Sequence, residues 1–268
     1  MGYLDYMDWK TLRFEVDEKG VATVTLCRPK EMNALSTTMF EELNVLLPQI
    51  DESTTIRAVI LTGEGKAFCA GGDLGEMKAG YGGNAGFYRH MEQANRCTAA
   101  LVELNKPVIA AVNGAATGAG INLALAADVV IASEKAKFSE IFGNVGLIPD
   151  LGGTYLLPRI VGRAKAKEIV FTYRMIAAQE ALELGIVHKL VEPDALMGEA
   201  RAMAEKFAAG PTFAFGMGKK LIDRSYETDL HTALHMEALS QALAANSRDH
   251  AEGVAAFFEK REHSFTGE

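Results

Sequence analysis

The sequence predicts an α/β protein whose last third is helical. In the first two thirds, short apolar runs typical of buried strands alternate with amphipathic helical segments. After Gly162 the apolar residues instead recur at helical spacing. The 268 residues are 49% hydrophobic and 23% charged, an ordinary balance for a globular protein. We place a boundary near residue 200, which divides an α/β core (1–199) from a helical region (200–268).

The N-terminal segments predict a hairpin, a helix and a strand. Residues Thr11–Val16 and Val21–Leu26 alternate apolar and polar side chains around "DEKG", which is typical of a β-hairpin. Thr38 and Glu41 have the spacing of a capping box, ahead of a helix through "MFEELNVLLPQI". The run "RAVILTG" that follows predicts a short buried strand.

The middle of the chain repeats strand and helix. A long amphipathic helix is predicted from about Ala85 to Leu104. It is followed by a strand in "PVIAAVNG", a helix in "GAGINLALAAD" and a strand in "VVIAS". This rhythm indicates strands that are joined by helical crossovers. In the helical region, Gly210-Pro211 predicts that one helix stops and another starts.

Composition excludes several functions. A net charge of −8 argues against nucleic acid as the main partner, because phosphate-binding surfaces need clustered Lys and Arg. Cys27, Cys69 and Cys97 are scattered without a C-x-x-C pair, which favours a reducing compartment. The first residues contain no apolar signal segment, so we expect a cytoplasmic protein. Polar residues interrupt the apolar stretch Pro107–Ala132, which predicts a buried core rather than a membrane span.

Two glycine-rich loops are the first functional signal. "FCAGGDL" (68–74) and "NGAATGAG" (113–120) each follow a buried strand and lead toward a helix. Glycine lets the backbone approach a ligand closely, and the start of a helix offers unpaired N–H groups. For one loop alone, tight packing explains the small residues as well. Two such loops together predict an oxyanion hole.

The segment "NVGLIPDLGGTY" is the second signal, because it is mostly apolar and holds one carboxylate, Asp150. Pro-Asp favours a turn, and Asp is a strong N-cap for a helix that enters "LGGTYLL". Burial in such a segment would also raise the pKa of Asp150 and make it a catalytic base. The residues alone leave these three interpretations open.

The chain resembles the crotonase, or enoyl-CoA hydratase/isomerase, superfamily in motifs that cover nearly its whole length. They are "RPKEMNAL", "GKAFCAGGDL", "KPVIAAVNGAATGAGINLALAADVVIAS", "AKFSE", "GLIPDLGGTYLLPRIVG", "AQEALELGIV" and "EGVAAFFEKR". The resemblance implies a spiral ββα core in 1–199, a helical trimerisation region in 200–268, and a trimer or dimer of trimers. It also implies an acyl-CoA thioester substrate, with coenzyme A as part of the substrate and no separate cofactor. We expect no metal, nucleic acid or membrane partner.

The resemblance also assigns site residues. Gly72 and Ala119, which stands where the family usually has glycine, would supply the oxyanion-hole amides. We expect Arg28 and Lys66 to contact the CoA phosphates, and Phe142 to contact the substrate. Phe257 and Lys260 would reach CoA across a subunit interface. The residues expected along adenine and pantetheine are Ala67, Phe68, Ala70, Asp73 and Leu74.

Two positions depart from the pattern of the family's hydratases. Asn122 and Phe142 stand where those enzymes have glutamates. Hydration needs one group to activate water and another to deliver a proton, and neither Asn nor Phe titrates near neutrality. The segment around Asp150 instead resembles the isomerase branch, which includes the ring-epoxide isomerases of phenylacetyl-CoA breakdown and the Δ3,Δ2-enoyl-CoA isomerases.

The leading hypothesis is therefore an acyl-CoA isomerase of fatty or aromatic acid breakdown, with Asp150 as the proton shuttle. Glu140 is a second candidate acid. If "KFSEIF" is extended, the side chains of Glu140 and Phe142 point to one face. The simpler expectation is that Glu140 is a carboxylate at the surface or at the rim of the site. The alternatives are a hydratase or hydrolase that uses Glu140 and Asp150, nucleophilic use of Asp150, and a non-catalytic acyl-CoA-binding protein.

Overall fold

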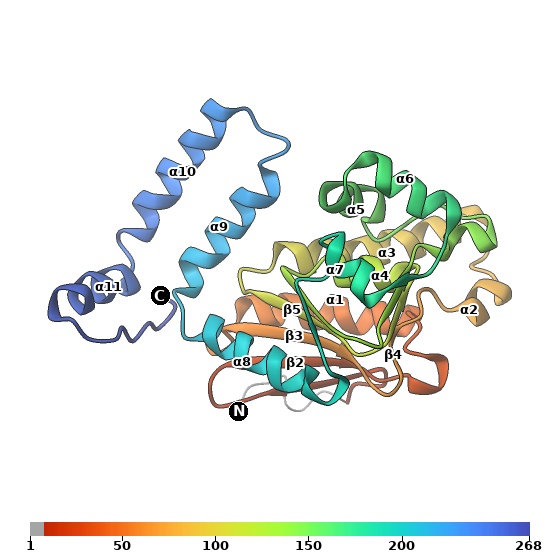
Figure 1. Cartoon of the computed structure of the whole chain (residues 1–268), viewed down its shortest axis with the longest axis horizontal. Coiled ribbons are helices and arrows are strands. Elements are labelled where there is room, and N and C mark those ends of the chain that lie inside the picture. Colours follow the sequence, from red (N-terminus) through yellow and green to blue (C-terminus); the bar gives the residue numbers. More distant parts are fainter. Residues whose placement is uncertain (1–7) are drawn as a thin grey trace.

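The computed structural model describes residues 8–268, and its larger element is a six-stranded sheet (Figure 1). The strand order is β1-β2-β3-β5-β7-β10. Its strands are β1 (Leu12–Val16), β2 (Val21–Leu26), β3 (Ala58–Gly63), β5 (Val108–Val112), β7 (Val129–Ser133) and β10 (Lys189–Val191). Strands β1 and β2 form the predicted antiparallel hairpin, and the pairs from β2 to β10 are parallel.

A second sheet of four short strands lies against the first. Its order is β4-β6-β8-β9, and its strands are β4 (Ala67–Cys69), β6 (Ala115–Thr117), β8 (Lys137–Ser139) and β9 (Ile176–Ala177). The chain therefore makes three successive turns, each with one strand in either sheet and then helix: β3–β4, β5–β6 and β7–β8. This confirms the expected spiral ββα core.

Eleven α-helices surround and extend the sheets in the described residues. They are α1 (Thr37–Glu52), α2 (Leu74–Ala79), α3 (Asn84–Glu103), α4 (Ala119–Leu125), α5 (Gly153–Val161), α6 (Arg163–Thr172), α7 (Ala178–Glu183), α8 (Leu196–Ala208), α9 (Thr212–Arg224), α10 (Leu230–Ala244) and α11 (Arg248–Glu259). Short 3-10 helices span Pro29–Glu31, Ile141–Val145 and Pro193–Ala195. No helix of residues 8–268 has the length and apolar character that a membrane span requires.

The first predicted helix starts differently from the expected capping box. Ser36, not Thr38, is the N-cap of α1, and its hydroxyl accepts a hydrogen bond from the Met39 amide at 3.2 Å. Ser36 has an extended backbone (φ −92°, ψ 165°), which an N-cap requires, while Thr38 already lies inside the helix.

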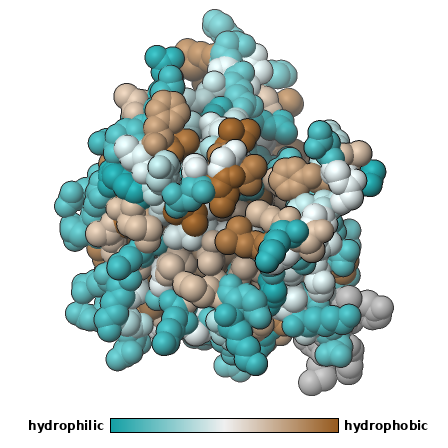
Figure 2. Space-filling model, turned by 90° about the vertical axis from the view of Figure 1, so that its right-hand side faces the viewer, coloured by the Kyte–Doolittle hydropathy of each residue, from teal (hydrophilic) through white to brown (hydrophobic). Residues whose placement is uncertain are grey.

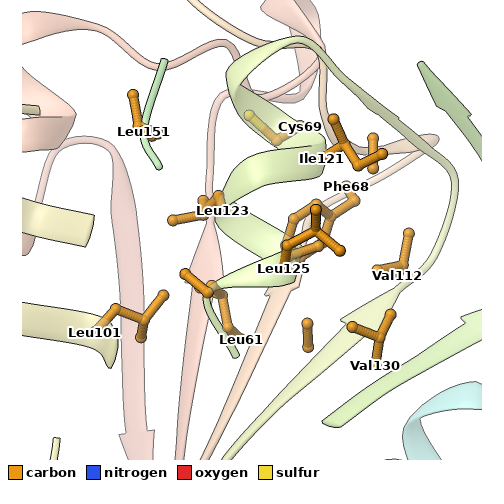
Figure 3. Packing of buried hydrophobic residues seen from close by; sticks show 14 of the residues in the cluster. Leu61, Phe68, Cys69, Leu101, Val112, Ile121, Leu123, Leu125, Val130 and Leu151 are labelled. Carbon is orange, nitrogen blue, oxygen red and sulfur yellow. The ribbon is translucent and has the colours of Figure 1, made fainter. Parts of the chain in front are cut away.

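The large sheet separates two hydrophobic cores. In β3, Val59 and Leu61 face the main core, whereas Ala58 and Ile60 face the other side, as the twofold alternation of a strand requires. The main core includes Phe68 from β4, and Ile121 with other side chains from α4 (Figure 3). Helix α8 covers the opposite face.

The boundary predicted near residue 200 falls inside α8. Ala200, Ala204 and Ala208 are at most 4% exposed and pack under the sheet, so a division after Ala208 fits the packing better. The segment after Gly162 is also not purely helical, because β9 and β10 each add an edge strand. Helices α9, α10 and α11 project away from the sheets (Figure 1), and α10 has no buried residue.

Candidate active site

The two glycine-rich loops touch each other. The Thr117 hydroxyl donates a hydrogen bond to the Ala70 carbonyl at 3.1 Å. Gly71 has φ +100°, and a β-carbon at this position would lie only 2.8 Å from the Thr117 carbonyl oxygen and 3.4 Å from the Ala119 nitrogen. Glycine is therefore required at 71, both by its backbone angle and by the neighbouring loop.

The amides of Gly72 and Ala119 are unpaired within the described residues. Leu35 receives the groups on either side of Gly72: its amide donates to the Gly71 carbonyl at 2.8 Å, and its carbonyl accepts from the Asp73 amide at 3.1 Å. In extended chain, successive amides point to opposite sides, so the Gly72 N–H faces away from Leu35. Ala119 is the first residue of α4, where an amide has no partner within the helix. Two free donors on adjoining loops match the predicted oxyanion hole.

Asp150 lies in a strained turn between the 3-10 helix 141–145 and α5. Leu151 adopts φ +45° and Gly152 φ +82°, and the Gly153 amide donates to the main-chain carbonyl of Asp150 at 2.8 Å. A leucine in the left-handed region costs about 1–2 kcal/mol, which its complete burial in the core offsets. The turn therefore holds Asp150 in one place.

The Asp150 carboxylate does not cap a helix. The N-cap of α5 is Gly152, without a side-chain hydrogen bond, so the N-cap interpretation is wrong. Asp150 Oδ1 is buried and has no hydrogen-bond partner among the described residues. Burial raises the pKa of Asp150 to about 7. An unpartnered carboxylate that titrates near neutrality suits a general base.

Asn122 and Glu140 are completely buried beside Asp150. The Asn122 side-chain amide donates to the Asp150 main-chain carbonyl at 3.0 Å and reaches Glu140 Oε2 at 3.4 Å. Burial raises the pKa of Glu140 to about 8; the Asn122 hydrogen bond lowers it and the charge of Asp150 raises it further. Glu140 is thus not the rim carboxylate that the sequence suggested. The segment after it is also not extended, because a 3-10 helix begins at Ile141.

The hydratase positions hold no acid. Asn122 is in contact with Gly153, where a β-carbon would lie 2.3 Å from its Nδ2. Phe142 is 7% exposed, and its Cζ would lie 3.8 Å from a β-carbon at Gly118, next to the oxyanion loop. Phe142 therefore borders the site, as expected of a substrate contact, without supplying a proton.

Of the other predicted residues, two have partners within the chain and three are open to a ligand. Arg28 Nη2 pairs with Asp73 Oδ2 at 2.7 Å, and Asp73 caps α2. Lys66 is exposed, Leu74 is 63% exposed, and Ala70 is partly buried. Lys66, Leu74 and Ala70 are thus accessible to a ligand, whereas the Arg28 charge is offset by Asp73.

Ala67 and Phe68 require a correction, because both are buried, and the Phe68 side chain lies in the main core (Figure 3). Each is at most 1% exposed, so neither side chain can line a CoA site. The reason is that 67–69 form strand β4 of the second sheet, and all three of its residues are buried. Only main-chain groups of these residues remain for a ligand.

Phe257 and Lys260 lie at the end of α11, far along the C-terminal helices from α4 and α5 (Figure 1). Phe257 is 79% exposed. A contact between these residues and an acyl-CoA at Asp150 would have to come from a second copy of the chain, and it stays a prediction.

The contact of Met77 with the first oxyanion loop was not predicted from the sequence. Met77 Cε would lie 2.5 Å from a β-carbon at Gly72, so this methyl group covers the first oxyanion loop. Its position one helical turn after the N-cap Asp73 was the available signal. His90 of α3 is buried and stacks on Tyr81 with ring centroids 4.2 Å apart. The side of the molecule with α2 and α6 carries apolar side chains at its centre (Figure 2).

Comparisons with known proteins show which family the chain resembles. A model of the enoyl-CoA hydratase/isomerase family matches residues 16–268. The chain is 42% identical to "1,2-epoxyphenylacetyl-CoA isomerase" of Escherichia coli (strain K12) over an alignment of 258 residues that covers 93% of this chain and 96% of that one. It is 39% identical to "Short-chain-enoyl-CoA hydratase" of Clostridium acetobutylicum, over 91% and 93% of the two chains. The crystal structure of an enoyl-CoA hydratase from Bacillus anthracis superposes with a TM-score of 0.92 at 38% identity, covering 97% of this chain and all of the other.

Proposed function

The chain belongs to the enoyl-CoA hydratase/isomerase family, and we propose that within it the protein is an isomerase that moves a double bond of an acyl-CoA thioester. Asp150 carries the proton, and the amides of Gly72 and Ala119 hold the thioester oxygen. The unpartnered Asp150 Oδ1 carries this proposal, together with the hydrogen bond from Asn122 that ties the Asp150 main chain to α4, the helix that begins at Ala119.

The oxyanion hole stabilises the enolate that forms during the shift. In this scheme the thioester carbonyl oxygen accepts both amides, and their donors are fixed before the reaction because the loops are locked together by Gly71 and Thr117. One such donor typically contributes about 2.7–4 kcal/mol to the transition state. The methyl group of Ala119 does not interfere, since the donor is its main-chain N–H.

The chemistry needs one base that acts twice. Ionised Asp150 takes a proton from C2 of a 3-enoyl thioester, and the C2 electron pair moves into the thioester to give a dienolate. The protonated Asp150 then returns a proton at C4, and the double bond forms between C2 and C3. A pKa of about 7 suits both steps, because both forms of the acid are populated near neutral pH.

A hydratase is the second candidate, because Glu140 and Asp150 interact electrostatically and could replace the missing pair of glutamates. The structure gives this candidate less support, since the Glu140 side chain is completely buried and cannot meet a substrate in this arrangement. Asn122 and Phe142 supply no acid at the two usual positions. Hydrolysis and acyl-CoA binding without catalysis are further alternatives that one product assay separates.

The proposed assembly is a homotrimer or a dimer of trimers. Helix α10 has no buried residue in the single chain, and its Leu230, Leu234, Leu239 and Leu243 are 51–70% exposed. So much apolar surface on one helix favours a partner surface. A second copy could then place Phe257 and Lys260 near the CoA of its neighbour.

The product mass tests the proposed reaction. The protein is incubated with 3-hexenoyl-CoA and, separately, with crotonyl-CoA, and the products are examined by mass spectrometry. An isomerase converts 3-hexenoyl-CoA to a conjugated product of unchanged mass, and adds 18 mass units to crotonyl-CoA only slowly. Rapid addition of water would favour the hydratase, and free CoA would indicate a hydrolase. Binding without any product would indicate a non-catalytic protein.

A further inference from the structure

Glu140 is a buried acid that the proposed mechanism does not use. Its side chain has no exposed surface, and its Oε1 has no hydrogen-bond partner in the described part of the chain. The neighbouring main chain is fixed, because the Gly118 amide donates to the Ser139 carbonyl at 2.8 Å and the Ser139 hydroxyl donates to the Tyr173 carbonyl at 3.0 Å. The main chain that carries Glu140 is therefore held in place, and in this arrangement its side chain does not reach the surface.

Asn122 connects this acid to the base. Its Nδ2 lies 3.0 Å from the Asp150 main-chain oxygen and 3.4 Å from Glu140 Oε2. On its other side Asn122 is confined by the start of α5, since a β-carbon at Gly153 would come within 2.6 Å of its Oδ1. These contacts hold the Asn122 amide in one orientation, and Glu140 is the side chain that accepts from it.

We propose that Glu140 is a positioning residue, which orients the Asn122 amide that holds the main chain of Asp150, and that it does not itself touch the substrate. The inference rests on the proposed role of Asp150 as the base. It separates the two acids into one that reacts and one that holds the first in place.

Burial beside another acid, with no cation acting on it among the described residues, favours a neutral Glu140 at pH 7. Three buried oxygens lack a donor: Asn122 Oδ1, Glu140 Oε1 and Asp150 Oδ1. A protonated Glu140 brings one O–H to this group, whereas an ionised one brings a further charge. Asp150 is the one charged group that acts on Glu140 among the described residues, and the Cys69 thiol beside Asp150 stays neutral because burial raises its pKa to about 12.

Ionisation of Glu140 then has a defined consequence for the reaction. The pKa of about 8 places it just above the pKa of Asp150. A charged Glu140 draws the Asn122 amide toward itself and adds a negative charge beside the developing enolate. We expect the rate to rise as Asp150 ionises and to fall as Glu140 ionises, with apparent pKa values that belong to the pair.

The test is a pH profile with 3-hexenoyl-CoA for the wild type, Glu140→Gln, Glu140→Ala and the exposed control Glu134→Gln. At pH 7, Glu140→Gln is expected to keep kcat within about threefold, because the amide mimics the neutral acid. Glu140→Ala is expected to lose at least about tenfold in kcat at nearly unchanged KM. The wild type and Glu134→Gln should slow about fivefold between pH 8 and 9, and Glu140→Gln should not.

Two results would overturn the inference. One is a Glu140→Gln profile that keeps the alkaline fall. The other is a loss in Glu140→Gln at pH 7 as large as that in Glu140→Ala, since Glu140 would then act as a catalytic acid. If Glu140→Gln does not fold, a wild-type profile without an alkaline fall has the same consequence.

Failure of the proposed function gives a different result. Asp150→Asn with nearly full activity would remove the role of Asp150 and with it the base that Glu140 is meant to position. Thermal unfolding reports on Glu140 without any activity: the midpoint of the wild type should fall relative to Glu140→Gln between pH 5 and pH 8. A constant difference would contradict a buried neutral acid.

Discussion

Replacement of Gly71 by alanine should damage catalysis more than stability. A β-carbon at this position would lie 2.8 Å from the Thr117 carbonyl oxygen, closer than such contacts allow, and φ is +100°. The backbone strain alone costs roughly 1–3 kcal/mol of folding free energy. Relief of the contact must separate residues 70–72 from 117–119, and these two loops carry both proposed oxyanion donors.

The catalytic loss follows from the displaced donors. Removal of one oxyanion donor costs about 2.7–4 kcal/mol, or roughly 10²–10³ in rate, so Gly71→Ala should lose kcat within that range. Steady-state rates with 3-hexenoyl-CoA and thermal unfolding measure the two effects on the same sample. The acyl-CoA affinity should change much less than kcat, because the donors act mainly in the transition state.

Gly80→Ala is a matched control for backbone strain. Gly80 has φ +82°, but a β-carbon there meets nothing within 4 Å. Gly80→Ala should therefore lose stability by a similar strain term and keep the wild-type rate. If Gly71→Ala retained activity within about threefold, the two loops would not form the oxyanion hole, and the site would have to be assigned elsewhere.

Three further predictions concern the burial of Glu140, the exposed face of α10 and the missing acid at Asn122. Below pH 4.5 Glu140 is neutral in both the folded and the unfolded chain, so its burial costs nothing there. As pH rises from 4.5 to its folded pKa of about 8, the wild type should lose up to roughly 5 kcal/mol of unfolding free energy relative to Glu140→Gln. Denaturant titrations in which the two proteins do not diverge would contradict the burial of Glu140 as a neutral acid. Leu234→Glu together with Leu239→Glu on exposed α10 should shift the light-scattering mass toward the 28.9 kDa monomer, and an unchanged oligomer would move the proposed interface elsewhere. Hydration of crotonyl-CoA should be slow because Asn122 supplies no acid, whereas turnover in the hundreds per second would show that another acid pair does this work.

The fold was largely predictable from alternation and helical spacing. The β1–β2 hairpin, strands β3, β5 and β7 and helix α3 all lie where the pattern placed them. Strands β4 and β6 have three residues each, too few to show a periodicity, so the second sheet followed only from the family resemblance. The boundary near residue 200 falls inside α8, because the alanines of this helix do not reveal from the sequence alone that they pack under a sheet.

The site was predictable in part. The glycine-rich loops and Asp150 were recognisable because their residue types are unusual at such junctions. The burial of Glu140 was not, since it depends on contacts with Asn122, which is 18 residues away, and with the turn at Asp150. Asn122 was interpreted only as a missing glutamate, although it holds the main chain of the proposed base. Ala67 and Phe68 were assigned to the ligand because the motif does not show which way a short strand faces.

The activity of Asp150→Asn tests the central claim most directly. The hydrogen bonds that the Gly153 amide and Asn122 donate to Asp150 use its main-chain oxygen, so the substitution leaves these two in place. Asn has the same size but cannot take a proton.

We predict that Asp150→Asn loses at least roughly 10²-fold in kcat with 3-hexenoyl-CoA, with unchanged acyl-CoA affinity and an unchanged or raised thermal midpoint. Intact-mass spectra of the wild type that are quenched during turnover should show no acyl adduct, which separates a base from a nucleophile. Asp150→Asn that keeps most of the wild-type rate would contradict the assignment of Asp150 as the proton carrier.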